Sequence, residues 1–250
     1  MPDGPTLYYS SILDGSTSHY GKKNCSVIFL GGCPLRCPWC YVPSLMTRSS
    51  SIPANVDFFV QHFRNQPQAE AVCITGGEPL DQGEAFVELC KALKAEGAAV
   101  KVETSGFFPD VLADALPYVD CVGMDVKTVF DVDAYHKITG SKGNPVALLS
   151  SVIRSIEAIR KSKWVFSEFR TTVVPGLTDK AEIVDAVSRE VSWCDLYVLQ
   201  QFRPDLELVD GLCQGLPQTP KETLLDLASV AKKHVKNVSI RTVDEGEIPV

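Results

Sequence analysis

The sequence predicts an α/β fold in which parallel strands alternate with helices. Short apolar runs of strand length alternate with amphipathic runs, and most of the short runs are apolar throughout rather than at every second residue. Continuous apolar runs are typical of parallel strands that helices cover on both faces. Seven strands are expected, at Cys25–Gly31, Ala71–Gly76, Ala98–Thr104, Cys121–Val126, Phe166–Val174, Leu196–Phe202 and Val238–Thr242. This pattern alone leaves open a doubly wound sheet, a closed barrel and a partial barrel.

Helix start and stop signals lie between these runs. Asp81 is expected to cap a helix that ends at Gly97, and Asn144 with the following proline opens another. Thr178 is expected to begin a third helix, and Thr219-Pro220-Lys221-Glu222 has the pattern of a capping box. Such β-α-β units are right-handed, so a ligand is expected at the carboxyl ends of the strands.

Composition bounds the class of protein. The chain has 250 residues, 45% apolar and 22% charged, which excludes a disordered or fibrous chain. It carries 24 Lys+Arg against 31 Asp+Glu, a net charge of −7, which argues against broad binding of nucleic acid or anionic membranes. No run is long enough to span a membrane and the N-terminus lacks the features of a signal peptide, so a cytoplasmic location is expected.

Three of the nine cysteines are closely spaced. Cys33, Cys37 and Cys40 form a C-x3-C-x2-C pattern directly after the first strand, and Pro34 and Pro38 keep this loop out of a helix. In a reducing compartment such thiols are expected to bind metal rather than form disulfides. Structural zinc and electron-transfer 4Fe-4S sites usually have four protein ligands. A 4Fe-4S cluster held by three thiolates leaves one iron open to a substrate or cofactor.

Other interpretations of the cysteines stay open at this point. One is a zinc site completed by Cys25 or His19, and another is three free thiols in the core. The remaining cysteines are isolated in the sequence and are expected to fill the core as small apolar residues: Cys73, Cys90, Cys121, Cys194 and Cys213.

Two motifs together resemble the radical S-adenosylmethionine (SAM) superfamily. One is the cysteine pattern with Trp39 before its last cysteine, and the other is Gly76-Gly77-Glu78-Pro79 at the end of the second strand. The resemblance extends from about residue 7 to about residue 243. It implies a partial (β/α)6-type barrel in a single domain, 1–250, with an entry segment (1–24), a core (25–205) and a C-terminal helix and strand (206–250). It also implies a 4Fe-4S cluster on the three cysteines, with SAM on the remaining iron.

Further site residues follow from this resemblance and from polar residues at strand ends. The Gly-Gly-Glu-Pro motif is expected at the amino group of SAM, and the strand ending Val173-Val174-Pro175-Gly176 on its adenine side. The segment Gln200-Gln201-Phe202-Arg203-Pro204, which closes the sixth strand, is a further expected contact with SAM or the substrate. The residues expected to bind the cofactor are Trp39, Gly76, Gly77, Glu78, Pro79, Thr104, Ser105, Asp125, Lys127, Arg170 and Val174.

The ends of the third and fourth strands, Glu103-Thr104-Ser105-Gly106 and Met124-Asp125-Val126-Lys127, resemble the glycyl-radical activating branch. In that branch, the matching positions hold a monovalent cation near the SAM carboxylate. The expected donors here are Glu103, Thr104, Asp125 and the Met124 carbonyl. Close relatives have Asp where this chain has Glu103, and the longer side chain moves the carboxylate.

The resemblance is closest to the longer activating proteins of anaerobic ribonucleoside-triphosphate reductase. It implies reductive cleavage of SAM, hydrogen abstraction from a glycine of this partner enzyme, and a reductant such as flavodoxin or ferredoxin. One alternative is a radical SAM enzyme that modifies a small molecule or a tRNA base, such as a deazapurine synthase. A second is a non-enzymatic iron–sulfur or zinc protein, which requires a fourth protein ligand such as Cys25.

Overall fold

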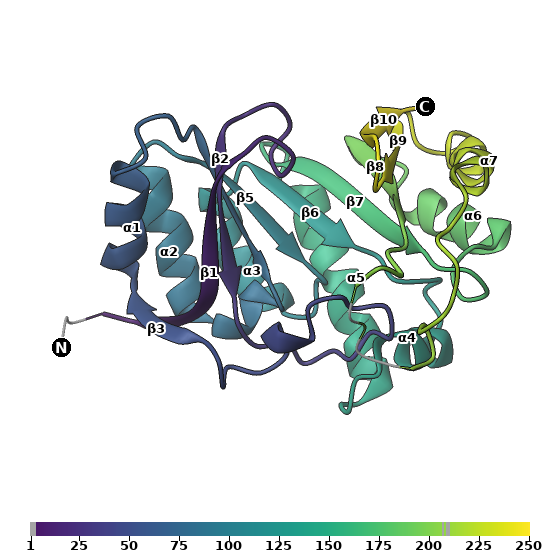
Figure 1. The fold of residues 1–250 in the computed structure, drawn as a ribbon, viewed down its shortest axis with the longest axis horizontal. Helices are drawn as coiled ribbons and strands as arrows, with labels where there is room; N and C mark the ends of the chain where they lie inside the picture. The colour runs from purple at the N-terminus through teal and green to yellow at the C-terminus, as the bar shows by residue number, and fades with distance from the viewer. Residues whose placement is uncertain (1–3, 207, 209–210) are drawn as a thin grey trace.

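The computed structural model describes residues 4–206, 208 and 211–250, which form one ten-stranded sheet. The strand order is β10-β9-β8-β7-β6-β5-β4-β2-β1-β3 (Figure 1). Residues 1–3 of the expected entry segment and residues 207, 209 and 210 of the expected C-terminal part lie outside the described residues.

Seven consecutive strands of the sheet are parallel, and they confirm all seven predicted strands to within one residue at each end. They are β2 (Cys25–Leu30), β4 (Ala71–Gly76), β5 (Ala99–Thr104), β6 (Cys121–Asp125), β7 (Phe166–Val173), β8 (Leu196–Gln201) and β9 (Val238–Thr242). Their carboxyl ends therefore meet at one edge of the sheet.

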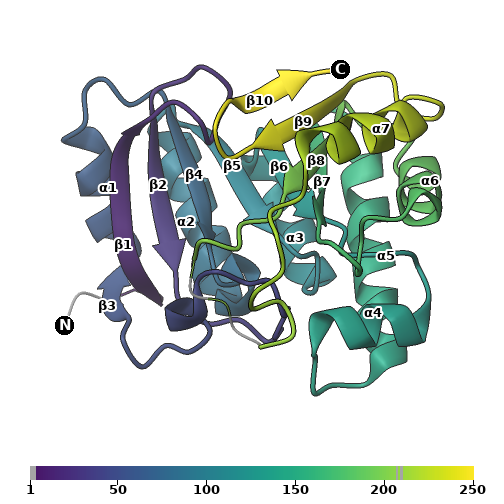
Figure 2. The same cartoon turned by 45° about the vertical axis from the view of Figure 1, so that its right-hand side comes forward.

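Three antiparallel strands were not expected from the sequence. They are β1 (Thr6–Ser16), β3 (Ile52–Asn55) and β10 (Gly246–Pro249). β1 and β3 extend the sheet beyond β2, and β10 lies beside β9 at the other edge (Figure 2). None is a continuous apolar run, and β3 and β10 contain prolines, which edge strands tolerate because one row of N–H groups faces solvent.

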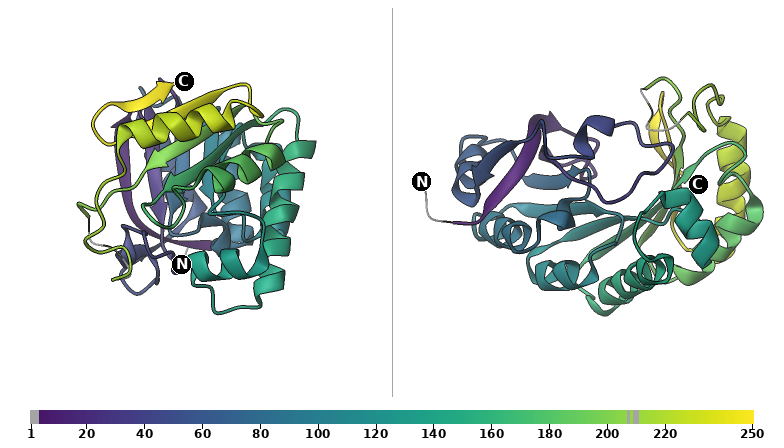
Figure 3. Two further views of the ribbon diagram at one scale, coloured as in Figure 1. Left: turned by 90° about the vertical axis from the view of Figure 1, so that its right-hand side faces the viewer. Right: turned by 90° about the horizontal axis from the view of Figure 1, so that it is seen from below.

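Helices cover the outer side of the curved sheet (Figure 3). They are α1 (Val56–Arg64), α2 (Glu84–Ala95), α3 (Pro109–Ala115), α4 (Val132–Thr139), α5 (Pro145–Lys161), α6 (Ala181–Glu190) and α7 (Lys221–Ala231). The parallel sheet, its curvature and its single helical layer confirm an α/β partial barrel. Among the described residues, no helix has the length and apolarity needed to cross a membrane.

One predicted helix start is confirmed and one is wrong by two residues. The Asn144 side chain accepts hydrogen bonds from the N–H groups of Val146 and Ala147 and so caps α5. Asp81 does not cap α2, because residues Pro79–Gln82 form a 3-10 turn and α2 begins after Gly83. Asp81 pairs with Arg48 instead, at 2.8 Å.

The two predicted threonine caps are also wrong, since both hydroxyls donate hydrogen bonds to backbone carbonyls of the strand β7. Thr178 Oγ1 donates to Thr172 O at 2.6 Å and accepts from Val174 N, while α6 begins three residues later. Thr219 Oγ1 donates to Val173 O at 2.6 Å, so there is no capping box, and Pro220 occupies the position before α7. In both cases a contact with the sheet replaces the local cap.

The two faces of the sheet differ in polarity. The helix-covered face is apolar, and the inner face is layered along the strands. At the amino ends, the buried side chains of Cys25, Val27, Ala71 and Cys73 form a small apolar cluster. Farther along lie charged residues, among them Asp125 of β6 beside Arg170 of β7. This order places the polar layer next to the carboxyl ends of the strands, where the cysteine loop follows β2.

Candidate functional site

Backbone contacts fix the loop that carries the three cysteines. Gly32 N donates to Leu45 O at 2.8 Å, and Cys33 N donates to Met46 O at 3.2 Å. The Arg36 Nη1 atom donates to the carbonyl oxygens of Cys33 and Leu35, each at 2.7 Å. The loop is thus held by its own side chain and by the segment that follows it, as a precise ligand site requires.

The two glycines of the second motif pack directly against this loop. A Cβ atom at Gly76 would lie 2.1 Å from Leu30 O, and one at Gly77 would lie 2.4 Å from Gly32 O. Gly77 N donates to Leu30 O at 2.9 Å, and Glu78 N donates to Gly32 O at 2.8 Å. Only glycine permits this approach, so the motif joins the end of β4 to the start of the cysteine loop.

Glu78 is 1% exposed, and its carboxylate is bonded within the protein. Its Oε1 accepts from Thr104 Oγ1 at 2.8 Å, and its Oε2 accepts from Ser105 N at 2.8 Å. The Ser105 hydroxyl donates to Oε2 at 2.5 Å, and Leu80 N to Oε1 at 3.2 Å. Burial raises the pKa of Glu78, while the bonds from Ser105 and Thr104 oppose this shift. The side chain therefore clamps the loop after β4 to the loop after β5.

A cavity of about 170 Å³, which we call the first cavity, lies at the carboxyl ends of the strands. All three cysteines of the loop line it, and so do most of the other residues expected at the cofactor: Trp39, Gly76, Gly77, Thr104, Ser105, Asp125, Lys127, Arg170 and Gln200, together with Glu103 of the expected cation site. Glu78, Pro79, Met124 and Val174 do not line it, and each is buried elsewhere.

Several residues that line the first cavity were not predicted from the sequence: Leu35, Tyr41, Val42, Met46, Thr75 and Thr172. Thr75 directly precedes the Gly-Gly pair and Tyr41 directly follows the last cysteine of the loop, so adjacency to a motif was an available signal. Met46 reaches the cavity only because its segment returns to bond with Cys33, and no sequence pattern shows this.

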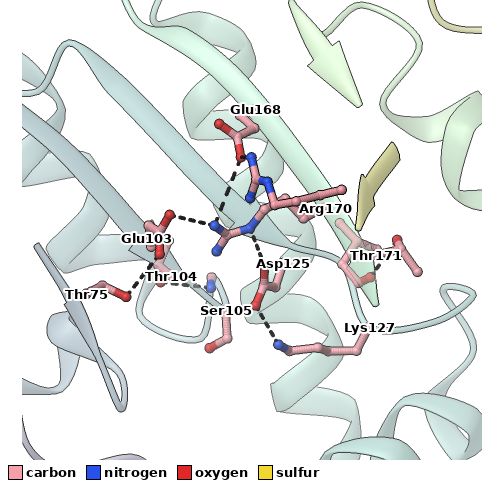
Figure 4. A network of polar contacts seen from close by, with 12 residues as sticks. Thr75, Glu103, Thr104, Ser105, Asp125, Lys127, Glu168, Arg170 and Thr171 are labelled. Carbon is pink, nitrogen blue, oxygen red and sulfur yellow. Dashed lines mark hydrogen bonds and ion pairs between the residues drawn. The ribbon is translucent and has the colours of Figure 1, made fainter. Parts of the chain in front are cut away.

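A network of buried charges forms one wall of the first cavity (Figure 4). Arg170 of β7 lies at its centre: Nη1 is 2.6 Å from Glu103 Oε1, and Nε is 2.7 Å from Asp125 Oδ1. Lys127 Nζ is 2.8 Å from Asp125 Oδ2. The Arg170 side chain reaches across β6 to β5 because Gly123 lies between, where a Cβ would be 3.6 Å from the guanidinium carbon.

The network continues deeper along the inner face through residues that the sequence analysis did not single out. Glu168 pairs with Lys101 at 2.8 Å and with Arg241 at 3.1 Å. Burial alone would raise the pKa of Glu168, but Lys101 and Arg170 lower it to about 2. Likewise, Arg170 and Lys127 hold the pKa of Asp125 well below its usual range despite burial. The carboxylates are therefore charged at neutral pH and are neutralised within the network.

A second cavity of about 210 Å³ adjoins the first, and the two share Tyr41, Glu103, Arg170 and Gln200 in their walls. Its other lining residues come from the segment after β1 and from the ends of β8 and β9: Ser18, His19, Gln201, Arg203, Arg241, Thr242 and Val243. Tyr41 is 43% exposed and Val243 38% exposed. The first cavity thus has a neighbour that reaches the surface between the N-terminal and C-terminal parts of the chain.

The structure also places the residues proposed to complete a zinc site. Cys25 lies at the amino end of β2, whereas the cysteine loop follows its carboxyl end. Six residues of strand separate them, or about 17–20 Å, so Cys25 is not a fourth ligand. His19 lines the second cavity, and its Nδ1 is 2.7 Å from Ser16 Oγ. The isolated cysteines expected to fill the core are all buried.

Comparisons with known proteins agree with this geometry. The family model described as the radical SAM superfamily matches residues 27–187. A Methanocaldococcus jannaschii protein with the provisional name glycyl-radical enzyme activating enzyme is 33% identical over 248 residues, covering 94% of this chain and 96% of the relative. A 7-carboxy-7-deazaguanine synthase from Methanospirillum hungatei is 39% identical over 114 residues, covering 46% of this chain and 45% of the relative. The solved structure of TYW1 with a lysine–pyruvate adduct has a TM-score of 0.64 at 14% identity, covering 98% of this chain and 89% of that chain.

The chain therefore belongs to the radical SAM superfamily, whose members use a 4Fe-4S cluster and SAM. The three cysteines suit such a cluster, because they lie on one short loop and line the same cavity. Among residues 4–206, 208 and 211–250, no three His, Cys, Asp or Glu side chains are arranged to hold a single metal ion. The fit to a cluster thus rests on the cavity that the cysteines share.

Proposed function

We propose that this radical SAM enzyme activates a glycyl radical enzyme by abstracting hydrogen from a glycine of that partner. The observation that carries the proposal is the pair of adjoining cavities, one lined by the cysteines and the other reaching the surface. A glycine in a protein loop needs such an open path to the reactive centre. The relative of provisional activating function, which matches almost the whole chain, supports the same conclusion.

In this proposal Cys33, Cys37 and Cys40 each bind one iron. When bound, the reduced cluster and SAM supply the 5′-deoxyadenosyl radical that takes the hydrogen atom. Gly76 and Gly77 bring the end of β4 against the cysteine loop and line the cavity in which SAM would bind. Trp39, 5% exposed, packs the loop onto the core and excludes water. Lys127 and Arg170 supply positive charge for the SAM carboxylate.

The proposed partner is an anaerobic ribonucleotide reductase, with flavodoxin or ferredoxin as the reductant. Its support comes from the sequence. Between Cys40 and Gly76 the chain has a single cysteine, Cys73, so this interval carries no ferredoxin-like insert of the kind found in activating enzymes with extra clusters. Cys73 itself is fully buried in the apolar cluster at the amino ends of the strands.

The test is anaerobic reconstitution with iron and sulfide, followed by reduction in the presence of SAM. The wild type is expected to form 5′-deoxyadenosine, whereas Cys37→Ala is expected to form none. Cys25→Ala is the matched control, because it removes a buried thiol at the other end of β2 and should keep the activity. A wild type that holds a full cluster yet forms no 5′-deoxyadenosine would contradict the proposal.

A second candidate function is modification of a small molecule, favoured by the deazaguanine synthase relative that matches 46% of the chain. Electron paramagnetic resonance separates the two functions. A glycyl-radical signal on a co-incubated anaerobic ribonucleotide reductase supports the first. SAM turnover that a deazapurine precursor stimulates, with no signal on the reductase, supports the second.

A further inference from the structure

The donors that the resemblance assigned to a monovalent cation are already engaged by side chains of this protein. Glu103 Oε1 binds Arg170 Nη1 at 2.6 Å, and Glu103 Oε2 accepts from Thr75 Oγ1 at 3.1 Å. Asp125 Oδ1 accepts from Arg170 Nε at 2.7 Å, and Asp125 Oδ2 accepts from Lys127 Nζ at 2.8 Å. Each carboxylate oxygen of the expected cation site therefore has a donor in the protein (Figure 4).

The other two expected cation ligands face elsewhere. Thr104 Oγ1 donates to Glu78 Oε1 at 2.8 Å and accepts from Gly106 N at 3.0 Å. Met124 lies within the ladder of a central strand, paired with Thr104 on one side and Phe169 on the other. Backbone carbonyls in such a position are engaged by the neighbouring strands.

The local charge also disfavours an added cation. Two carboxylates, Glu103 and Asp125, face two bonded cations, Arg170 and Lys127, and Lys101 Nζ lies 3.6 Å from Glu103 Oε1. The Arg170 side chain is only 9% exposed and that of Lys101 only 4%. Lys101 is itself paired with Glu168 at 2.8 Å, so three cations already balance three carboxylates. A further positive ion would leave an excess positive charge that water screens weakly.

We infer that the Arg170 guanidinium takes the place of the monovalent cation, so that SAM binding requires neither K⁺ nor Na⁺. A guanidinium suits this role because its planar fork donates to two carboxylates at once and stays charged. The Glu103 side chain is long enough to carry its carboxylate to the guanidinium, at 2.6 Å. The absence of a side chain at Gly123 opens the path between them. The inference rests on the proposed SAM site.

The first experiment compares cations on the wild-type protein. SAM affinity of the reconstituted enzyme is measured in KCl, NaCl and choline chloride at equal ionic strength. The dissociation constants are expected to agree within about twofold, because no site selects the small ions. An affinity about tenfold higher in K⁺ or Na⁺ than in choline, roughly the contribution of one ionic ligand contact, would overturn the inference.

The second experiment removes the guanidinium with Arg170→Gln. This change frees oxygens of Glu103 and Asp125, so the variant is expected to gain a dependence on K⁺ or Na⁺ of about tenfold in SAM affinity. Arg160→Gln is the control, since Arg160 is an exposed helix residue whose contacts, with Glu157 and the ring of Trp193, lie outside the two cavities. A folded Arg170→Gln protein that binds SAM equally well in all three salts would also overturn the inference.

A third measurement separates this inference from the proposed function. Thallium NMR detects binding of a monovalent ion to the protein before reconstitution and therefore needs no cluster, SAM or activity. No specific binding is expected for the wild type, and binding is expected for Arg170→Gln. Specific binding to the wild type would overturn the inference. If the enzyme bound SAM in none of the salts, the proposed function would be wrong, while the thallium titration would still show whether the protein binds a monovalent cation.

Discussion

Gly77→Ala is expected to displace the cysteine loop, because backbone oxygens lie where the new methyl group would be. The added Cβ would be 2.4 Å from Gly32 O and 2.7 Å from Leu45 O. Real Cβ atoms essentially never come within 3.0 Å of another heavy atom, so the Gly32 oxygen must move by at least 0.6 Å (3.0 minus 2.4). Both obstacles are backbone atoms, so no side-chain rotation relieves the contact.

The size of the effect follows from the bonds that such a shift disturbs. Gly32 O accepts from Glu78 N, and Leu45 O accepts from Gly32 N, each at 2.8 Å. Overpacking costs about 1–3 kcal/mol and a lost backbone hydrogen bond about 1 kcal/mol. A total of about 2–4 kcal/mol lowers the melting temperature of a chain of this length by about 4–16 °C. Because Cys33 follows Gly32 directly, the iron content after reconstitution should fall as well.

The assay is thermal unfolding by circular dichroism, with iron and sulfide measured after reconstitution. Gly143→Ala is the matched control, since a Cβ there meets only the Ser141 hydroxyl, at 3.6 Å. If Gly77→Ala matched this control in both melting temperature and iron content, the glycine would not be holding the loop, and the reasoning would be refuted.

Three further predictions concern buried polar groups. The pKa of Glu168 is lowered to about 2 from 4.5, so its negative charge stabilises the fold above pH 4.5, and this stabilisation is lost as the pH falls through 2. Glu168→Gln should therefore reduce the fall in melting temperature between pH 4.5 and 2. Equal falls in melting temperature for the wild type and the variant would contradict this prediction. Thr219→Val should lower the free energy of unfolding by about 1 kcal/mol, while Glu222→Ala changes it by less than about 0.5 kcal/mol. Equal losses for the two variants in denaturant titrations would instead indicate that Thr219 and Glu222 form a capping box. Glu78→Gln turns an amide N–H₂ toward one of the two donor pairs, either Ser105 N and Oγ or Thr104 Oγ1 and Leu80 N. The change should cost about 1–3 kcal/mol in the same titrations, whereas an unchanged midpoint would show that these bonds contribute little.

Much of the fold could be predicted because several of the parallel strands are nearly continuous apolar runs. β2, β4 and β6 follow that rule, whereas β7 alternates apolar residues with Glu168, Arg170 and other polar residues. The antiparallel strands do not follow it either, since β1 is mixed in polarity and β3 contains Pro53. The threonine caps failed for a different reason: Thr178 and Thr219 bond to β7, which is distant in sequence from Thr219, and tertiary contacts of this kind override local helix signals.

The site was predictable only in part for a similar reason. The site residues at strand ends could be predicted because they are polar residues that follow apolar runs, and most of them line the first cavity. Their partners were not visible, because the bond from Arg170 to Glu103 depends on the registers of three strands and on Gly123 between them. Lys101 and Glu168 could also have been predicted as members of the network, because they are charged residues within predicted strands.

The row of charges across β5, β6, β7 and β9 also bears on how the sheet assembles. Side chains alternate between the faces of a strand, so a slip of β7 by one residue would turn Glu168 and Arg170 toward the apolar helices. Isolated charges buried in such surroundings are far more costly than a mismatched pair of aliphatic side chains. The same ionic contacts that shape the wall of the first cavity therefore destabilise incorrect strand alignments. A chain with wrongly paired strands gains little stability from hydrophobic collapse.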